Sequence, residues 1–202
     1  MNIDSVCIAT VTDAGAVAHL VNKSYRPEVG SPGWTHESDL VSGERTNERQ
    51  VIDTISRKDS FILLGLRGHE VIACVHVEKE GKNCYIGMLA VSPSLQGSGI
   101  GKRMLSQAEH FANTNFASET FTMLVLSERL ELISFYERRG YQRTDAVMDY
   151  PLSAGVGIPK VEGLKIEILK KRPNNRAESD VGDAARSAAS ASRASSPLTG
   201  EL

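Results

Sequence analysis

Apolar residues recur every three or four positions in four stretches of the chain, which is the spacing of one face of an α-helix. The first stretch follows capping residues at 12–13 and the second follows Thr46, so a polar side chain begins each of these predicted helices. The third predicted helix begins near Gly99. The fourth covers 130–139 and ends at Gly140, where a glycine in the left-handed conformation stops a helix.

The other apolar runs are short and bounded by Gly, Pro, Asn or Asp, which is typical of strands. The turns at 67–69 and 80–83 are so short that they predict antiparallel neighbours. A longer loop at 26–43 holds the single tryptophan, Trp34, and loops of this length inside a domain are often functional. The sequence predicts strands at 6–10, 61–66, 71–78, 85–91, 121–126, 141–147 and 164–169.

The composition narrows the class of protein. A chain of 202 residues with a net charge of −2 predicts one domain and gives no reason to expect nucleic acid or a membrane as partner. Three cysteines in apolar runs, without a Cys-x-x-Cys pair or an apolar leader, predict a cytoplasmic protein, with the nucleus as the alternative. From 173 to 202 the chain is dominated by Ala and Ser, which predicts a disordered tail after a domain at 1–172.

The stretch Gln96-Gly97-Ser98-Gly99-Ile100-Gly101-Lys102 joins a predicted strand to a predicted helix. Three glycines in five residues are costly to order, and a bare backbone at a helix N-terminus is typical of a site that holds an anion. The spacing does not match a P-loop or a dinucleotide-binding turn. The positions of Gln96, Gly99 and Gly101 resemble the coenzyme A pyrophosphate loop of the GNAT superfamily of acetyltransferases, with a plain strand-to-helix turn as the alternative.

Two neighbouring segments strengthen this resemblance, which covers residues 3–170. Residues 88–93 resemble the end of the family's fourth strand, and residues 134–141 resemble its later helix with a glycine stop and an aromatic residue. The resemblance implies an α/β (α+β) fold of three layers, with four helices around a mixed, mostly antiparallel sheet of six or seven strands. The fourth and fifth strands of that sheet splay apart, and acetyl-CoA lies in the gap.

The resemblance also implies which groups hold acetyl-CoA. The strand before the glycine-rich loop would bond the pantetheine arm, and the loop would hold the pyrophosphate against a helix N-terminus. Lys102 and Arg103 either add positive charge or are ordinary solvated residues. No metal is expected. The implied cofactor-binding residues are Leu89, Ala90, Val91, Gln96, Gly97, Ser98, Gly99, Ile100, Gly101 and Lys102.

The chemistry depends first on Tyr136, which matches the tyrosine that many relatives use as a general acid toward the departing thiolate. Its alternative role is a core aromatic. The amide of Leu89 is the candidate donor to the thioester carbonyl. The sequence does not identify the general base that would take the proton of the amine. Relatives often carry a glutamate where this chain has Tyr85, and His76 resembles a structural histidine. Arg129 is a second difference from the family's common pattern, since relatives often have an asparagine at this position.

The acceptor is expected across the gap, between the loop at 26–43 and the loop between the last two strands. Glu37 and Asp149 would suit a cationic amine, and Trp34 could pack against it. Each of these could equally be an ordinary loop residue. The candidate acceptor residues are Tyr25, Trp34, Tyr85, Thr35, His36, Glu37, Asp149 and Tyr150.

The predicted function is therefore acetyl transfer from acetyl-CoA to a primary amine of a small molecule, by direct attack in a ternary complex. The protein would act as a monomer or a homodimer. One alternative is an acyl-CoA-binding sensor without turnover, which the missing glutamate favours. The other is a peptide or protein N-acetyltransferase.

Overall fold

Seven strands form one mixed sheet in the computed structural model, which describes residues 3–27, 33 and 35–173. Neighbouring strands are antiparallel except for β5 and β6, which run parallel. A second, small sheet pairs β2 (Val41–Ser42) with β8 (Ile158–Pro159). In order across the large sheet, the strands are β1 (Ser5–Ile8), β3 (Ser60–Arg67), β4 (Glu70–Glu80), β5 (Asn83–Val91), β6 (Thr120–Leu126), β9 (Lys165–Lys171) and β7 (Gln142–Asp149).

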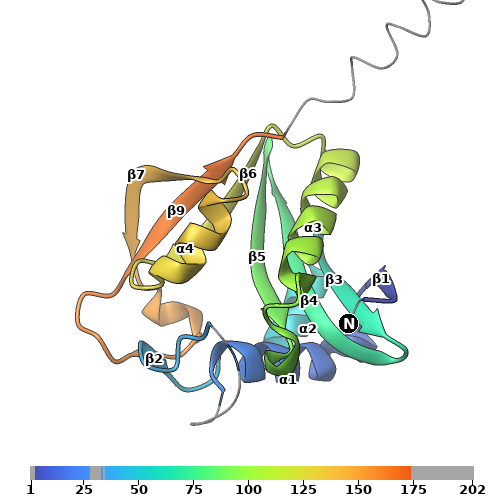
Figure 1. Cartoon of the computed structure of the whole chain (residues 1–202), viewed down its shortest axis with the longest axis horizontal. Coiled ribbons are helices and arrows are strands. Elements are labelled where there is room, and N and C mark those ends of the chain that lie inside the picture. The colour runs from blue at the N-terminus through green and yellow to red at the C-terminus, as the bar shows by residue number, and fades with distance from the viewer. Residues whose placement is uncertain (1–2, 28–32, 34, 174–202) are drawn as a thin grey trace, which may run out of the picture.

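Helices cover both faces of the large sheet (Figure 1). Successive side chains of a strand point to opposite faces, so two separate cores form. Leu63 and Val75 belong to the core under α3 and α4, whereas Ile62 and Cys74 belong to the core under α1 and α2. The structure thus confirms the three-layer fold. The helices are α1 (Ala14–Tyr25), α2 (Glu48–Ser56), α3 (Ile100–Phe116) and α4 (Leu130–Glu137).

The structure differs from the expected start of α2 by one residue. Asn47, not Thr46, is the cap: its side chain accepts a hydrogen bond from the Gln50 amide at 3.0 Å, and the Gln50 side chain accepts one from the Asn47 amide at 3.2 Å. Thr46 is buried, and its amide donates to Asn22. Both residue types cap helices well, so the sequence pattern could not choose between them.

The described chain ends just after β9, so residues 174–202 of the predicted tail lie outside the described residues. None of the described helices has the length and apolar character needed to cross a bilayer. Among the described residues, no group of three His, Cys, Asp or Glu side chains is placed to hold a metal ion.

β5 and β6 separate part of the way along their length, as the family resemblance implies (Figure 1). The two strands pair only where residues 83–85 lie opposite residues 120–122. Beyond this point the inner edge of β5 has no partner in the large sheet. The separation leaves the later half of β5 facing α4 rather than another strand.

A bulge interrupts the ladder on the other side of β5. Between Gly87 and Ala90 the register with β4 shifts, because β5 has one residue more than β4 in this interval. Met88 adopts a left-handed conformation with φ of 48°. Met88 and Leu89 consequently have no register partner in either ladder, and the Met88 carbonyl instead accepts a hydrogen bond from the Cys74 thiol at 3.7 Å.

His76 on β4 is buried and makes stability depend on pH. Its Nε2 atom lies 2.8 Å from the Ser60 hydroxyl and 3.5 Å from the Glu78 carboxylate. Burial lowers the pKa of His76 from 6.5 to about 4, so the folded protein keeps this ring neutral. An unfolded chain binds a proton below pH ~6.5, so acid favours unfolding. We expect His76 to remove on the order of 2 kcal/mol of stability between pH 7 and pH 5.

The substitution His76→Gln should abolish that part of the loss, as measured by urea unfolding at the two pH values. His110→Gln is the matched control, because His110 is exposed on α3. This control should lose as much stability between pH 7 and pH 5 as the wild type does. An equal loss in His76→Gln and in the wild type would contradict the assignment.

Candidate active site

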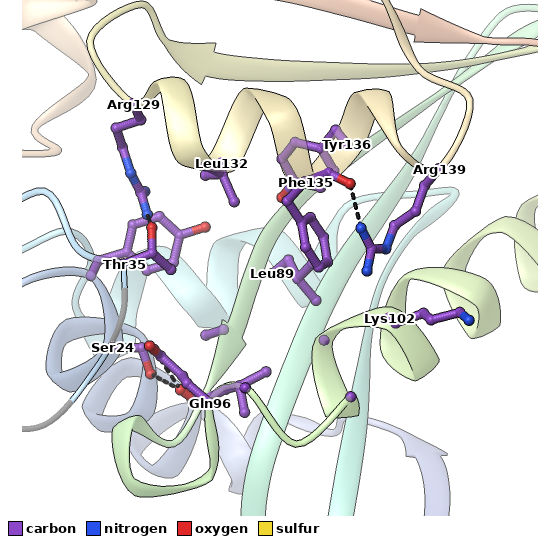
Figure 2. Close-up of a pocket in the computed structure, with 16 residues that line it drawn as sticks. Ser24, Thr35, Leu89, Gln96, Lys102, Arg129, Leu132, Phe135, Tyr136 and Arg139 are labelled. Carbon is purple, nitrogen blue, oxygen red and sulfur yellow. Dashed lines mark hydrogen bonds between the residues drawn. The ribbon is translucent and has the colours of Figure 1, made fainter.

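Two cavities open where β5 and β6 separate. The first has a volume of about 250 Å³ and lies between the end of β5, the start of α3, and α4 (Figure 2). The second has a volume of about 240 Å³ and extends between β5, β6 and the loop that follows β7. The cavities share five lining residues, which are Tyr25, Leu89, Arg129, Leu132 and Tyr136.

The turn before α3 gives the first cavity an uncovered backbone. Gly97 and Gly99 have φ values of 78° and 89°, a region that favours glycine. A Cβ at either position would meet nothing within 4 Å, so open space lies in front of both. Gly99 is also the N-cap of α3, whose first amides have no side-chain cap. Open space before a bare helix N-terminus fits a pyrophosphate.

The other residues of the loop contribute unequally. Gly101 and Lys102 line the first cavity. Ser98 and Ile100 do not, because the Ser98 hydroxyl donates to the Leu95 carbonyl at 2.5 Å and the Ile100 side chain is buried in the core. Ser98 and Ile100 can therefore contribute only main-chain groups to a ligand.

The last residues of β5 form the side of the first cavity that is expected to hold pantetheine. Leu89, Ala90 and Val91 all line it. The Val91 carbonyl already accepts hydrogen bonds from the Ser24 hydroxyl at 3.0 Å and from the side-chain amide of Gln96 at 3.3 Å (Figure 2). Leu89, which lies outside both ladders, is therefore the first candidate to bond a ligand through its main chain.

Arg139 is a cation of the first cavity that sequence reasoning missed. Its guanidinium lies over the Phe135 ring, 3.4 Å from the centroid, and donates to the Phe135 carbonyl (Figure 2). Its Nε atom is buried without a hydrogen-bond partner. Lys102 lines the same cavity, whereas Arg103 donates to the Ile3 carbonyl at 2.7 Å and does not line it. The pair of arginines directly before Gly140 was the sequence pattern that could have pointed to this cation.

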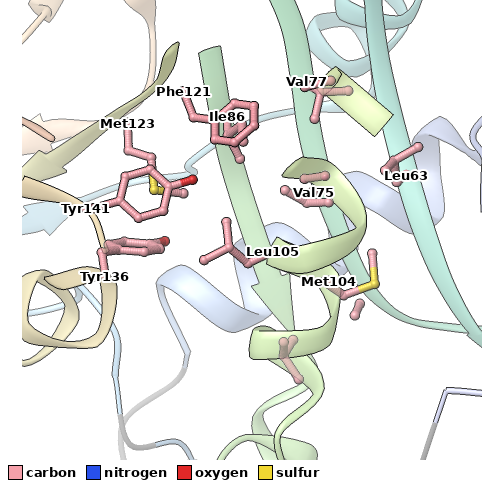
Figure 3. Packing of buried hydrophobic residues seen from close by; sticks show 14 of the residues in the cluster. Leu63, Val75, Val77, Ile86, Met104, Leu105, Phe121, Met123, Tyr136 and Tyr141 are labelled. Atoms are coloured by element: carbon pink, nitrogen blue, oxygen red, sulfur yellow. The ribbon is translucent and has the colours of Figure 1, made fainter. Parts of the chain in front are cut away.

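Tyr136 lies where the two cavities meet, and its ring points from α4 toward the central strands (Figure 3). It is 5% exposed and packs against the rings of Phe135 and Tyr141, with centroid distances of 5.2 and 5.8 Å. Burial raises the pKa of Tyr136 to about 12, although the charge of Arg129 opposes the shift. Its hydroxyl is therefore protonated at neutral pH and can act as a donor.

Two further tyrosines line the second cavity. Tyr85 lies over Gly87, where a Cβ would come within 2.2 Å of the Tyr85 hydroxyl oxygen, so a side chain at this position would force the Tyr85 ring to move. Tyr25 lines both cavities. Burial raises the pKa of Tyr85 and of Tyr25, so neither phenol can serve as a base at neutral pH.

The two carboxylates expected to hold a cationic amine are already paired. Arg26 donates to one oxygen of Glu37 through Nε at 3.1 Å and Nη2 at 2.8 Å, and both side chains are buried. Glu37 lines the second cavity with its charge balanced in this way. Asp149 is exposed, lies 2.5 Å from the Lys165 ammonium, and lines neither cavity.

The remaining acceptor candidates are spread over the site. Tyr150 lines the second cavity, and its hydroxyl donates to a main-chain carbonyl at 2.8 Å. Thr35 lines the first cavity and accepts a hydrogen bond from Arg129 at 2.5 Å. His36 lines neither cavity, and its Nδ1 atom is buried without a hydrogen-bond partner. Trp34 lies outside the described residues.

Two loops far apart in the sequence join beside the second cavity, and we call segments 37–43 and 156–160 together the loop clasp. β2 and β8 pair within it, and the Arg26 guanidinium donates to the carbonyls of residues 43 and 156, both at 2.6 Å. Gly157 packs so closely that a Cβ would lie 2.5 Å from a main-chain oxygen of the other segment. The clasp therefore fixes the loops against each other.

Comparisons with known proteins agree with the fold. The model of the acetyltransferase (GNAT) family matches residues 19–141. The uncharacterized protein YdhI of Bacillus subtilis (strain 168) is 29% identical over 84 residues, which are 42% of this chain and 50% of that protein. The match therefore spans only half the length of this relative.

Solved structures share the fold. The ribosomal-protein-S18-alanine N-acetyltransferase of Escherichia coli matches with a TM-score of 0.62 and 15% identity, over 89% of this chain and 98% of that one. The PaiA N-acetyltransferase of Thermoplasma acidophilum, in complex with coenzyme A, matches with a TM-score of 0.63 and 16% identity, over 84% and 99% of the two chains. Because the family model covers more than half of the sequence, this chain belongs to the GNAT family of acetyltransferases.

Proposed function

We propose that this protein transfers the acetyl group of acetyl-CoA to a primary amine of a small molecule, which attacks while both are bound. The observation that carries the proposal is the junction of two cavities at Leu89 and Tyr136. One cavity has a bare helix N-terminus suited to a pyrophosphate, and the other has room for a separate acceptor. When bound, acetyl-CoA supplies a thioester carbonyl that is activated toward amines.

Leu89 and Tyr136 donate hydrogen bonds to the two atoms of the thioester that gain negative charge, the carbonyl oxygen and the sulfur. The Leu89 amide donates a hydrogen bond to the carbonyl oxygen as negative charge develops there. The Tyr136 hydroxyl donates to the sulfur as the thiolate departs. With a phenol pKa of about 12 against ~8.5 for a thiol, full proton transfer is uphill by roughly 5 kcal/mol. A hydrogen bond from Tyr136, with water supplying the proton, avoids that barrier.

The second cavity lacks a free base among its described residues, because its carboxylate, Glu37, is held by Arg26. The acceptor amine therefore binds in its neutral form or loses its proton to water. A lysine-like amine is neutral in only about one molecule in a thousand near pH 7. Acceptor kcat/KM should consequently rise with pH up to the pKa of the amine.

The size and cover of the second cavity support a small acceptor. Its volume of about 240 Å³ is below the ~300–1,000 Å³ that is typical of ligand pockets. The loop clasp fixes the loops on its acceptor side, where a peptide substrate would need an open groove. A small primary amine satisfies both constraints.

The proposal is tested by incubating the full chain with acetyl-CoA and a panel of primary amines. Released thiol is measured by its absorbance after reaction with a disulfide reagent, and the acetylated product is identified by mass spectrometry. We expect thiol release that depends on the amine. Tight binding of acetyl-CoA without thiol release for any amine would instead indicate an acyl-CoA sensor.

A further inference from the structure

The second cavity has more positive than negative charge around it. The charged residues that line it, among the described ones, are Glu37, Arg45 and Arg129. Arg26 binds Glu37, and Glu131 lies 3.6 Å from the Nε atom of Arg129. Three guanidiniums are thus accompanied by two carboxylates, which leaves one positive charge without a counter-charge in this cluster.

Arg129 is a buried cation with an incomplete set of partners. Its side chain is 7% exposed. Nη2 bonds the neutral hydroxyl of Thr35, and Nη1 is 3.9 Å from Glu37, which is too long for a hydrogen bond. Nε has no hydrogen-bond partner. Buried charges are normally paired and hydrogen-bonded, so this arrangement indicates a place for an anionic group of a ligand.

Arg45 is the second cation and has no described carboxylate within 4 Å. Its guanidinium carbon lies 5.5 Å from the centre of the Tyr25 ring, and that of Arg129 lies 5.8 Å from the same ring. The charge of Arg45 also acts on the phenols of Tyr25, Tyr85 and Tyr150, where it opposes the rise in pKa caused by burial. Arg45 therefore acts electrostatically on much of the cavity wall.

We propose that the acceptor is a small amino acid with an apolar side chain, whose carboxylate binds between Arg45 and Arg129. This inference rests on the proposed acetyltransferase function and names its substrate class. The carboxylate supplies the missing negative charge and can accept paired hydrogen bonds from a guanidinium. The apolar side chain packs against a wall formed by Ile86, Met88, Met123, Val125, Leu126 and Ile166.

This placement directs the amine toward the junction of the cavities at Leu89 and Tyr136. The amine nitrogen forms a bond to the thioester carbonyl carbon, and the carbon–sulfur bond breaks. The nitrogen loses its proton to water, and the departing sulfur takes up one proton. The products are an N-acetyl amino acid and free coenzyme A.

The test compares L-leucine with L-leucinamide and 3-methylbutylamine, which keep the amine and the apolar chain but lack the carboxylate. Thiol release by the full chain should show a kcat/KM for L-leucine at least ~100-fold above that of either analogue, because the analogues leave the guanidiniums unpaired. Arg45→Gln should reduce this ratio at least ~10-fold, while Arg45→Lys, which keeps the charge, should retain most of it. Melting temperatures verify that each variant is folded.

Arg49→Gln is the matched control, because Arg49 is exposed on α2 and lines neither cavity. This variant should keep the wild-type ratio. If either analogue reacts as fast as L-leucine, the amino-acid inference is wrong, and the acetyltransferase function stands. If no amine of either panel releases thiol although acetyl-CoA binds, both proposals are wrong.

Discussion

Gly101→Glu should weaken acetyl-CoA binding at least ~100-fold, or about 2.7 kcal/mol, without unfolding the protein. Gly101 lines the first cavity within α3, and a Cβ there would make only ordinary contacts of 3.8 Å with Phe135 and Val91. The helix should tolerate the change, since glycine is less favourable than most residues inside a helix. The new carboxylate would occupy phosphate space and repel the diphosphate by roughly 4 kcal/mol per close charge pair.

Isothermal titration calorimetry with acetyl-CoA measures the dissociation constant, and circular dichroism checks the fold. Asn113→Glu introduces the same charge on the exposed side of the same helix, about 18 Å further along its axis. It should bind acetyl-CoA almost as the wild type does. A folded Gly101→Glu protein with unchanged affinity would show that the loop before α3 does not hold the pyrophosphate.

Tyr136→Phe should lower kcat by about 10²–10³-fold, the range that the loss of one hydrogen-bond donor to a developing negative charge usually costs. The change removes one hydroxyl and leaves the packing of the ring against Phe135 and Tyr141 intact. Because burial raises the pKa of Tyr136 to about 12, the phenol stays protonated through pH 10. The wild type should therefore not lose activity by ionisation of this group between pH 7 and pH 10.

Steady-state kinetics across that pH range measures both effects. Tyr141→Phe is a matched control, because the Tyr141 hydroxyl donates to Glu109 at 3.0 Å and Tyr141 lines neither cavity. It should cost about 1.5–3 kcal/mol of stability, since the lost hydrogen bond is to a carboxylate, and leave kcat unchanged. Equal kcat for Tyr136→Phe and wild type at every pH would limit Tyr136 to a packing role.

The periodic patterns predicted the helices and strands and their order along the chain, because these depend on local spacing, whereas the three layers came from the family resemblance. The glycine loop was recognisable for the same reason, since Gln96, Gly99 and Gly101 are close together in the sequence. The splay of β5 from β6 came from the family resemblance and not from the residues themselves. The bulge at Met88 and Leu89 lies in the part of β5 that does not pair with β6, and its local sign in the sequence is Gly87, since a glycine inside a strand often marks a bulge.

The electrostatics of the acceptor side could not be predicted in this way. Glu37 suited a cationic amine when it was considered alone, but the fold pairs it with Arg26. Arg45 and Arg129 are 84 positions apart in the chain, and only the folded structure brings both to the ring of Tyr25. The charge of a cavity is a sum over distant residues, so a motif of adjacent residues cannot reveal it.

The loop clasp has a consequence for how acceptor preference could be altered. Its two strands are joined across 116 positions of sequence by the hydrogen bond from Ser42 to Ile158, and Gly157 has no room for a side chain. A segment transplanted from a relative into one loop alone would lose its counterpart in the other. Swapping both segments together is the way to exchange selectivity between such proteins while keeping the scaffold.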